Sequence, residues 1–209
     1  MTISSPTVAV IDYGTGNLRS VIKAFETLGS MPFLVSGPDE IGRAEALVFP
    51  GQGCFPDCMQ SLRESGLADL LRDWIADNKP YFGICLGLQV LFDHSEEGDS
   101  PGLGVFSGIT KRFRLPSKFK IPHMGWNEIS FTPENTSCLK KNLSDGDQFY
   151  FVHSYCVVPK DDKIVLSRTD FGGEFVSSIS FGNCHATQFH PEKSQAKGLQ
   201  IYRNFLKTI

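Results

Sequence analysis

Short apolar runs alternate with helical patterns through the first half of the chain. The runs that predict strands are 7–12, 31–35, 46–51 and 80–84. Apolar residues at helical spacing lie between or after these runs, at 17–28, 59–64, 67–76 and 86–92. Strands and helices in alternation favour a parallel sheet, because a parallel connection needs a long crossover and a helix supplies it. The first half is therefore predicted to be an α/β unit.

The second half changes to short strand patterns separated by turn residues. The successive runs are KRFRL, NEISF, QFYFVHSYCVV, KIVLSRT, FVSSISF and CHATQFH, with turn signals at 172–173 and 182–183. These runs predict antiparallel hairpins appended to the sheet, and 194–209 closes the chain with a helical pattern. The predicted fold class is α/β, a mostly parallel sheet flanked by helices with additional antiparallel strands. No linker or internal repeat divides 1–209, so a single domain is expected.

Charge and cysteine content exclude several classes of protein. Lys and Arg total 20 against 23 Asp and Glu, a net charge of −3 that gives no reason to expect nucleic acid or a membrane surface as partner. No apolar run approaches the ~20 residues of a membrane span, and the N-terminus lacks the pattern of a secretory signal, so we expect a cytoplasmic protein. The cysteines are then expected as thiols. Cys54 and Cys58 form the one close pair, and without a second pair or a histidine cluster no metal site is predicted.

The run Gly83-Ile84-Cys85-Leu86-Gly87 stands where a predicted strand meets a predicted helix. Its spacing is that of the G-x-S-x-G turn, in which glycines leave room for a sharp bend that exposes the nucleophile. The free N–H groups at the start of the helix would favour a thiolate. Cys85 is therefore predicted to be a nucleophile, although a small buried residue between packing glycines is the alternative. The other five cysteines lack this frame and are predicted to be small, buried apolar residues.

A nucleophilic cysteine needs a base, and His190 is the best candidate. The other histidines are predicted to be structural, capping or solvated, at positions 94, 123, 153 and 185. Pro191 biases His190 toward an extended conformation, in which residues i and i+2 point the same way. Glu192 should then lie beside His190 and orient its ring, which gives the Cys-His-acid arrangement of an acyl-transfer triad. Taken alone, HPE would fit a His-Pro turn with a surface glutamate equally well.

The oxyanion formed by nucleophilic attack needs hydrogen-bond donors. The N–H of Leu86 directly follows the nucleophile and is one candidate. The run PGQG at 50–53 follows the third predicted strand and offers a second, flexible stretch of backbone. A Pro-Gly pair is often only a loop, but this one would lie beside the strand of the nucleophile.

With GICLGLQ, HPE and PGQG, the sequence resembles the class I glutamine amidotransferases along essentially the whole chain. Further matching runs are IDYGTGNLRSV at 11–21, PHMGWN at 122–127, YFVHSY at 150–155 and TQFHPEKS at 187–194. Together they resemble one branch of the family, the glutaminase subunits of imidazole glycerol phosphate synthase, which supply ammonia in histidine biosynthesis. The resemblance implies a flavodoxin-like fold and no cofactor.

The resemblance also implies a role for each matching position. Cys85 would attack the side-chain amide of glutamine, His190 would protonate the departing ammonia and then activate water, and Glu192 would orient His190. The glutamyl thioester would be hydrolysed to glutamate. Gln52 and Leu86 would supply the oxyanion N–H groups. Glutamine would be held by Gly53, Gln89, Glu97 and Ser154, although Glu97 alone would be interpreted as a solvated acid.

A protein partner is implied as well. Released ammonia would be mostly protonated in water and then no nucleophile, so a dry passage to a docked synthase makes chemical sense. In the family this partner is a cyclase subunit with a (β/α)8-barrel fold, in a heterodimer. The matching contact positions are Asn17, Trp126, Tyr150 and Lys193, with a core tryptophan as the alternative for Trp126. Family members hydrolyse glutamine weakly until the partner binds its ligand, and the glycine-flanked PGQG peptide is the predicted switch.

Three rival interpretations remain at this point. GTGNLR at 14–19 imitates a dinucleotide-binding G-x-G-x-x-G loop, but Arg19 replaces its third glycine. A non-catalytic binding subunit is a second rival, although all three triad residues are present. The nearest alternative within the family is the glutaminase of pyridoxal phosphate synthesis.

Overall fold

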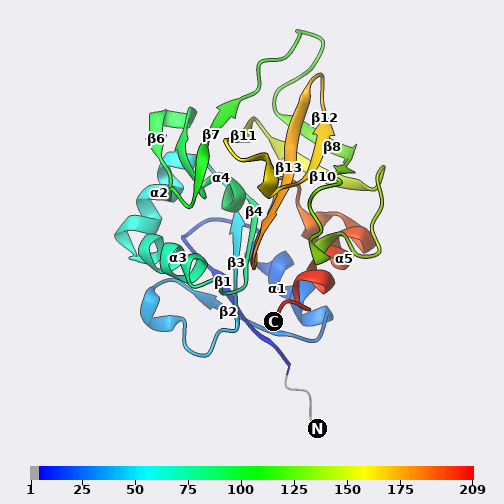
Figure 1. Ribbon diagram of the computed structural model, residues 1–209. Coiled ribbons are helices and arrows are strands. Elements are labelled where there is room, and N and C mark those ends of the chain that lie inside the picture. The colour runs from blue at the N-terminus through cyan, green and yellow to red at the C-terminus, as the bar shows by residue number, and fades with distance from the viewer. Residues whose placement is uncertain (1–4) are drawn as a thin grey trace.

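The computed structural model describes residues 5–209, and its centre is a sheet of eight strands (Figure 1). Five neighbouring strands are parallel, in the order β2 (Met31–Val35), β1 (Thr7–Ile11), β3 (Ala46–Gly51), β4 (Tyr81–Cys85) and β14 (Cys184–Thr187). This is the strand order of flavodoxin-like sheets, in which the order reverses between β1 and β3. The predicted parallel α/β unit is confirmed.

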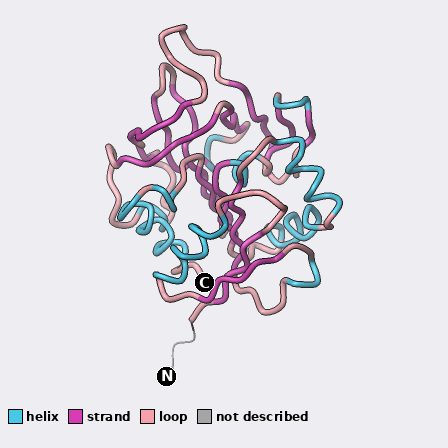
Figure 2. The backbone as a smooth tube through the Cα atoms, turned by 180° about the vertical axis from the view of Figure 1, so that it is seen from behind, coloured by secondary structure: helices cyan, strands magenta, loops and turns pink. Residues whose placement is uncertain are grey.

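Helices cover both faces of the parallel strands (Figure 2). The helices α1 (Leu18–Thr27) and α5 (Gln195–Phe205) lie on one face, and α2 (Phe55–Glu64) and α3 (Leu67–Ala76) lie on the other. The sequence of strand β1 is apolar from Val8 to Ile11 and does not alternate with polar residues, because both of its faces are buried. Val8 and Val10 pack into the core with α1 and α5, whereas Ala9 and Ile11 pack into the core with α2 and α3. A strand buried on both faces needs apolar side chains at every position.

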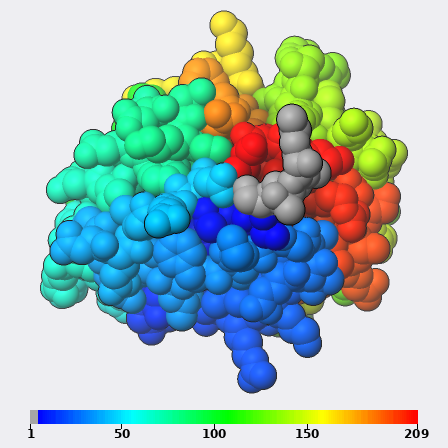
Figure 3. Space-filling model, turned by 90° about the horizontal axis from the view of Figure 1, so that it is seen from below, coloured from blue at the N-terminus to red at the C-terminus, as the bar shows by residue number. Residues whose placement is uncertain are grey.

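The first and last helices contact each other. The ring of Phe25 in α1 lies 4.6 Å, centroid to centroid, from the ring of Tyr202 in α5. Seen from below, the red C-terminal residues accordingly lie beside the blue N-terminal ones (Figure 3). This packing holds the segment before α5, which carries His190, against the parallel sheet.

The second half of the chain is more divided than its sequence predicts. Three antiparallel strands continue the main sheet beyond β14: β13 (Glu174–Phe181), β12 (Val165–Asp170) and β9 (Ser130–Phe131). The predicted hairpin of FVSSISF and CHATQFH is confirmed, because β13 and β14 pair antiparallel around the turn at 182–183. The expectation that CHATQFH is only appended to the sheet is wrong, because β14 also pairs in parallel with β4, a strand from the first half of the chain that local turn signals do not reveal.

The run QFYFVHSYCVV is not one strand. It divides at Ser154 into β10 (Gln148–His153) and β11 (Tyr155–Pro159), which belong to different small sheets. β10 pairs with β8 (His123–Glu128), and β11 pairs with β7 (Phe106–Arg112). The second small sheet also contains β5 (Phe92–Ser95) and β6 (Ser100–Pro101). Ser154 therefore marks a junction between the two sheets.

Two predicted helix boundaries are wrong. The helix expected over 86–92 is only α4 (Leu86–Gln89), and His94, expected at its end, lies in β5 with its Nε2 2.8 Å from Asp99 Oδ1. A short apolar run such as LQVLF fits a buried strand as well as a helix, so the spacing of its apolar residues cannot distinguish the two. Helix α2 begins at Phe55, four residues before the predicted start, because proline is tolerated in the first turn of a helix.

Short 3₁₀ turns complete the chain, at Pro38–Glu40, Glu97–Asp99, Cys138–Lys140, Asp162–Ile164 and Pro191–Lys193. Within residues 5–209, no helix has the length and apolar character to cross a membrane. The strands β3, β4 and β14 end at one edge of the sheet, because they are parallel. Ligands of open α/β sheets bind at this carboxyl edge.

Candidate active site

Cys85 lies at the sharp turn between β4 and α4. Its backbone has φ +52° and ψ −100°, a strained conformation that residues with a side chain rarely adopt. A Cβ on Gly83 would overlap the carbonyl group of Gly87, and a Cβ on Gly87 would overlap the carbonyl oxygen of Phe49 in β3. The two glycines are therefore required by close backbone approach.

His190 and Glu192 follow β14 and form a buried pair. The Nδ1 atom of His190 lies 2.8 Å from Glu192 Oε1, and both side chains are 2% exposed. The other carboxylate oxygen accepts a hydrogen bond from the Tyr202 hydroxyl at 3.4 Å. The expected extended geometry is only partly right, because Pro191–Lys193 is a 3₁₀ turn. The turn nevertheless brings the carboxylate back to the ring two residues earlier.

The charge states of the buried histidines separate His190 from His123, His153 and His185. Burial alone would lower the pKa of His190, but the Cys85 sulfur and the Glu192 carboxylate outweigh it and raise the pKa to about 9. His190 therefore holds a proton at neutral pH. Burial lowers the pKa of His123 to about 4, of His153 to about 3 and of His185 to about 4, so these rings remain neutral.

A cavity of about 410 Å³ opens beside Cys85. The predicted site residues that line it are Gln52, Gly53, Cys85, Leu86, Gln89, Glu97, Ser154, His190 and Lys193. Glu192 touches His190, while Asn17, Trp126 and Tyr150 are absent from the lining. The structure thus gathers residues from the ends of five strands, β3, β4, β5, β10 and β14, around one thiol.

The two predicted oxyanion donors differ in availability. Leu86 is the first residue of α4, where an N–H group has no partner within the helix. The N–H of Gln52 instead donates to the Tyr13 hydroxyl at 2.7 Å. The same hydroxyl donates to the Gln52 carbonyl at 2.5 Å, and Thr15 Oγ1 donates to that carbonyl at 3.1 Å. In this conformation Gln52 does not offer its N–H to an oxyanion, so its predicted role requires the peptide to rotate.

The loop after β1 therefore has a use that differs from cofactor binding. Its sequence imitates a dinucleotide-binding loop, but Tyr13 and Thr15 are hydrogen-bonded to the backbone of Gln52. Burial raises the pKa of Tyr13, so its hydroxyl keeps the proton that it donates. The GTGN loop is thus part of the support of PGQG.

The predicted glutamine contacts have defined partners. A carboxylate oxygen of Glu97 accepts the N–H of Phe55 at 3.0 Å in the first turn of α2, a favourable place for negative charge. Glu97 is therefore a held carboxylate at the cavity rather than a freely solvated acid. The Nε2 atom of Gln89 donates to the Tyr155 carbonyl and to Gln188 Oε1, each at 3.1 Å. Because both N–H groups of Gln89 are committed, its Oε1 is the atom left for a ligand.

Three of the predicted contact residues form a cluster. The rings of Trp126 and Tyr150 lie 6.1 Å apart on the paired strands β8 and β10, and Lys193 Nζ lies 5.8 Å from the Tyr150 ring centre. Trp126 is 46% exposed, so the alternative of a core tryptophan is wrong. Lys193 also lines the cavity, which joins this cluster to the site. Asn17 is separate, and its Oδ1 accepts a hydrogen bond from Ser20 Oγ at 2.9 Å.

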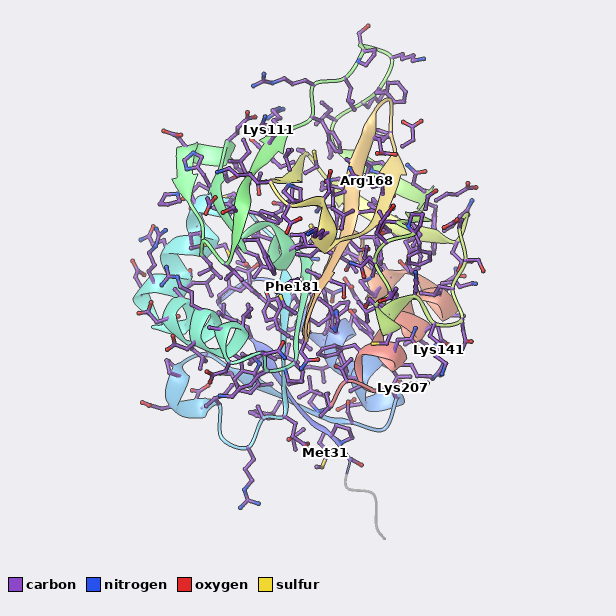
Figure 4. All side chains as sticks on the ribbon, viewed as in Figure 1. Met31, Lys111, Lys141, Arg168, Phe181 and Lys207 are labelled. Carbon is purple, nitrogen blue, oxygen red and sulfur yellow. The ribbon has the colours of Figure 1, made fainter. Side chains whose placement is uncertain are left out.

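The exposed apolar side chains elsewhere are more scattered. Met31 lies at the lower end of the molecule and Phe181 near its middle (Figure 4). By contrast, Met124 is 63% exposed two residues before Trp126, on the same face of β8. The face of the β8–β10 pair that carries Met124 and Trp126 therefore combines an exposed apolar side chain with the aromatic cluster, and Lys193 connects it to the cavity.

The prediction that the remaining five cysteines are buried is only partly right. Cys58 and Cys184 are buried, Cys54 and Cys156 are half-buried, and Cys138 is exposed. Burial raises the pKa of Cys156 to about 11, so this thiol stays protonated. Among residues 5–209, no group of three or more His, Cys, Asp or Glu side chains is placed to hold a metal ion.

The sequence-based prediction missed two residues at the site, Tyr13 and Gln188. The Nε2 atom of Gln188 lies 3.5 Å from Cys85 Sγ, and the Gln188 side chain is fully buried. A signal was available for Gln188, because residues i and i+2 of an extended segment share a face and His190 is two residues away. No local signal connects Tyr13 with Gln52.

Comparisons with known proteins agree with the site. The chain matches the family described as "Glutamine amidotransferase class-I" over residues 9–209. It is 46% identical to the imidazole glycerol phosphate synthase subunit HisH of Chromobacterium violaceum, over 95% of this chain and 96% of that protein. It is 50% identical to the subunit of the same name from Aquifex aeolicus, over 94% of each.

Solved structures share the fold at much lower identity. The structure of PurLQS from Thermotoga maritima matches with a TM-score of 0.77 and 21% identity, over 98% of this chain and 99% of that one. A crystal structure of a glutamine amidotransferase matches with a TM-score of 0.71 and 21% identity, over 96% and 97%. These likenesses support the predicted fold class.

Proposed function

Because the chain belongs to the class-I glutamine amidotransferase family, we propose that it hydrolyses glutamine to glutamate and ammonia and passes the ammonia to the cyclase subunit of imidazole glycerol phosphate synthase. Residues 1–209 would act as one glutamine amidotransferase domain, in histidine biosynthesis. The observation that carries the proposal is the convergence of Cys85, His190 and Glu192 at one cavity. The curated relatives are named as subunits of that synthase, which supports a partner subunit.

The first half-reaction uses the charge state of His190. The Cys85 sulfur attacks the side-chain carbonyl carbon of glutamine, and the carbonyl electron pair moves to its oxygen. The N–H of Leu86 is the donor available for that oxygen. When the C–N bond breaks, the imidazolium of His190 gives its proton to the nitrogen, which leaves as ammonia. The pKa of about 9 keeps this proton in place at neutral pH.

The second half-reaction returns the enzyme to its starting state. After it has lost its proton, His190 accepts one from a water molecule, and the resulting hydroxide attacks the thioester carbon. The C–S bond then breaks, the sulfur leaves as a thiolate and glutamate is released. Glu192 holds the Nδ1 side of the ring, so that Nε2 is the nitrogen that exchanges the proton.

The cavity supplies groups suited to an amino acid. The Glu97 carboxylate can pair with the α-ammonium group of glutamine, and Gln89 Oε1 can accept a further N–H. The backbone at Gly53 and the Ser154 hydroxyl can donate to the α-carboxylate. All four residues line the cavity, which supports glutamine as its occupant.

The PGQG segment is proposed as the switch for partner stimulation. To face an oxyanion, the Gln52 N–H must leave the Tyr13 hydroxyl. Gly53 has φ +99° and an added Cβ would meet only Thr15 Oγ1 at 3.7 Å, so the peptide beside it has room to rotate. Gly51 is unsuitable for testing the switch, because a Cβ there would overlap Leu86 and displace the nucleophile turn itself.

The cluster of Trp126, Tyr150 and Lys193 is proposed as the contact with the (β/α)8-barrel cyclase, in a heterodimer. Exposed aromatic side chains next to a cation are typical of interface centres. Lys193 reaches both the Tyr150 ring and the cavity, so a docked partner would close the side on which ammonia is released. Asn17 is the last residue of the GTGN loop and is proposed as a further contact.

The decisive experiment measures glutamine hydrolysis by the purified chain, alone and with the barrel cyclase, each with and without the cyclase ligand. We expect slow hydrolysis alone, faster hydrolysis in the liganded complex and none with Cys85→Ala. Absence of hydrolysis in the liganded complex, or activity that survives Cys85→Ala, would overturn the proposal.

A further inference from the structure

A chain of hydrogen bonds connects the glutamine-binding residues with the Cys85 sulfur. The Tyr155 carbonyl oxygen accepts from Gln89 Nε2 at 3.1 Å, and the same nitrogen donates to Gln188 Oε1 at 3.1 Å. The other end of the Gln188 amide, its Nε2, lies 3.5 Å from Cys85 Sγ. Gln188 is fully buried and lies between β14 and His190.

One carbonyl group fixes the orientation of both amides. The Tyr155 oxygen can only accept, so the Gln89 atom facing it must be the NH₂ group. For the same reason His153 Nδ1, 2.8 Å from this oxygen, carries the proton of its neutral ring and donates. The second N–H of Gln89 then requires an acceptor, which must be Gln188 Oε1. The Gln188 group that remains, and that faces the sulfur, is therefore its NH₂.

We propose that Gln188 stabilises the Cys85 thiolate by donating an amide N–H to the sulfur. The inference rests on the glutaminase function proposed above, for which the thiolate is the nucleophile. An amide N–H can only donate, so it favours the form of the sulfur with the greater negative charge. Two further polar groups face the sulfur. The Val152 carbonyl oxygen at 3.9 Å would favour the protonated thiol, whereas the charged His190 ring favours the thiolate and is left unchanged in the variants below.

The hydrogen bond acts in both half-reactions. It increases the fraction of thiolate before attack. A more stable thiolate is a weaker nucleophile, but this loss is smaller than the gain in thiolate, because the Brønsted coefficient is only about 0.4–0.5. When the thioester breaks, the sulfur recovers its electron pair and Gln188 stabilises it as the leaving group. The backbone of Gln188 is held independently, through its N–H to the Ser177 carbonyl at 2.9 Å.

Two variants separate the donor from the packing. Gln188→Met keeps the length of the side chain and removes the donor. Gln188→Glu keeps an acceptor for Gln89 but places a carboxylate beside the sulfur. The readout is the rate at which iodoacetamide alkylates Cys85 as a function of pH, followed by mass spectrometry of the Cys85 peptide because the chain has six cysteines.

We expect alkylation at neutral pH to slow about tenfold in Gln188→Met, the effect of losing one hydrogen bond to a charged group, and further in Gln188→Glu. The pH at which alkylation reaches half its maximal rate should rise by about one unit in Gln188→Met. These shifts require no glutamine and no partner.

Asn204→Leu is the matched control. It removes another buried amide, whose Nδ2 donates to the Leu139 and Lys141 carbonyls in a different part of the fold. It should lower the thermal midpoint and leave the pH profile of alkylation at that of the wild type. If Gln188→Met and Gln188→Glu fold but alkylate with the wild-type profile, the proposal is wrong and Gln188 has a packing role only. A missing glutaminase activity with shifted alkylation would instead contradict the proposed function alone.

Discussion

Two glycine-flanked turns end the adjacent strands β3 and β4, and they are fixed by different means. The β4 turn, Gly83 to Gly87, is fixed by steric contact, because its backbone touches that of Phe49 and leaves no alternative path. The β3 turn, Pro50 to Gly53, is fixed at Gln52 by hydrogen bonds that its carbonyl accepts from Tyr13 and Thr15 and that its N–H donates to Tyr13. Steric contact holds the nucleophile in one place, whereas hydrogen bonds worth about 1 kcal/mol each can be exchanged. One turn is therefore suited to chemistry and the other to regulation.

The largest effect is expected from Gly87→Ala, which tests the steric side of this comparison. Its Cβ would overlap the Phe49 carbonyl oxygen, so we expect the free energy of unfolding to fall by about 3 kcal/mol. We also expect the glutaminase activity to be lost. Urea denaturation measures the first and the stimulated hydrolysis rate the second. Gly53→Ala in the other turn is the control and should cost about 1 kcal/mol, from its positive φ alone. Equal losses would contradict the distinction between the turns.

Glu192→Gln tests the base that serves the fixed nucleophile turn. It asks whether Glu192 keeps the His190 ring charged. The wild-type pKa is raised from 6.5 to about 9, so the protonated ring is stabilised and its contribution to stability is present below pH 6.5 and lost as the pH rises to 9. Without the carboxylate the pKa falls, and the alkaline limb of glutamine hydrolysis should move to lower pH. Activity at neutral pH should fall about 10²-fold. A limb that stays in place would show that Glu192 does not set the charge of His190.

Trp126→Ala tests the surface from which a partner would act on the movable turn. Removing a half-exposed aromatic anchor should weaken binding of the barrel cyclase by about 2 kcal/mol, roughly thirtyfold in Kd. Calorimetric titration gives the affinity. Met31→Ala, which removes another exposed apolar side chain at the lower end of the molecule, should bind like the wild type (Figure 4). If the two variants bind equally well, the cyclase docks elsewhere.

The smallest effect, but one of opposite sign, is expected from Tyr13→Phe. It removes both hydrogen bonds between the hydroxyl and Gln52, so the N–H is released and the hydrolysis rate without partner should rise about threefold to tenfold. Thr15→Val removes only the bond to the Gln52 carbonyl and should raise the rate less. Steady-state assays without cyclase measure both. A decrease in Tyr13→Phe would mean that the hydroxyl supports the active conformation instead.

The predictions that succeeded rest on contacts between residues close in sequence. The helix over Leu67–Ala76 was predicted with its exact bounds, since an uninterrupted apolar face ends where polar residues begin. His190 and Glu192 are two residues apart, so a turn or a strand brings them together. One prediction that failed concerns 86–92, a short apolar run that divides between helix α4 and strand β5. The other concerns CHATQFH, whose parallel partner β4 lies far away in the chain.

The sequence by itself determined the chemistry and the local backbone: a cysteine between two glycines, a histidine with its acid, and a chain whose apolar pattern folds into a parallel sheet. Only the tertiary structure decided where the Gln52 N–H points and what touches the sulfur. The physical reason is that a peptide plane or a side-chain amide turns toward whichever partner packing provides. Those partners, Tyr13 for Gln52 and Gln188 for Cys85, are 39 and 103 residues away.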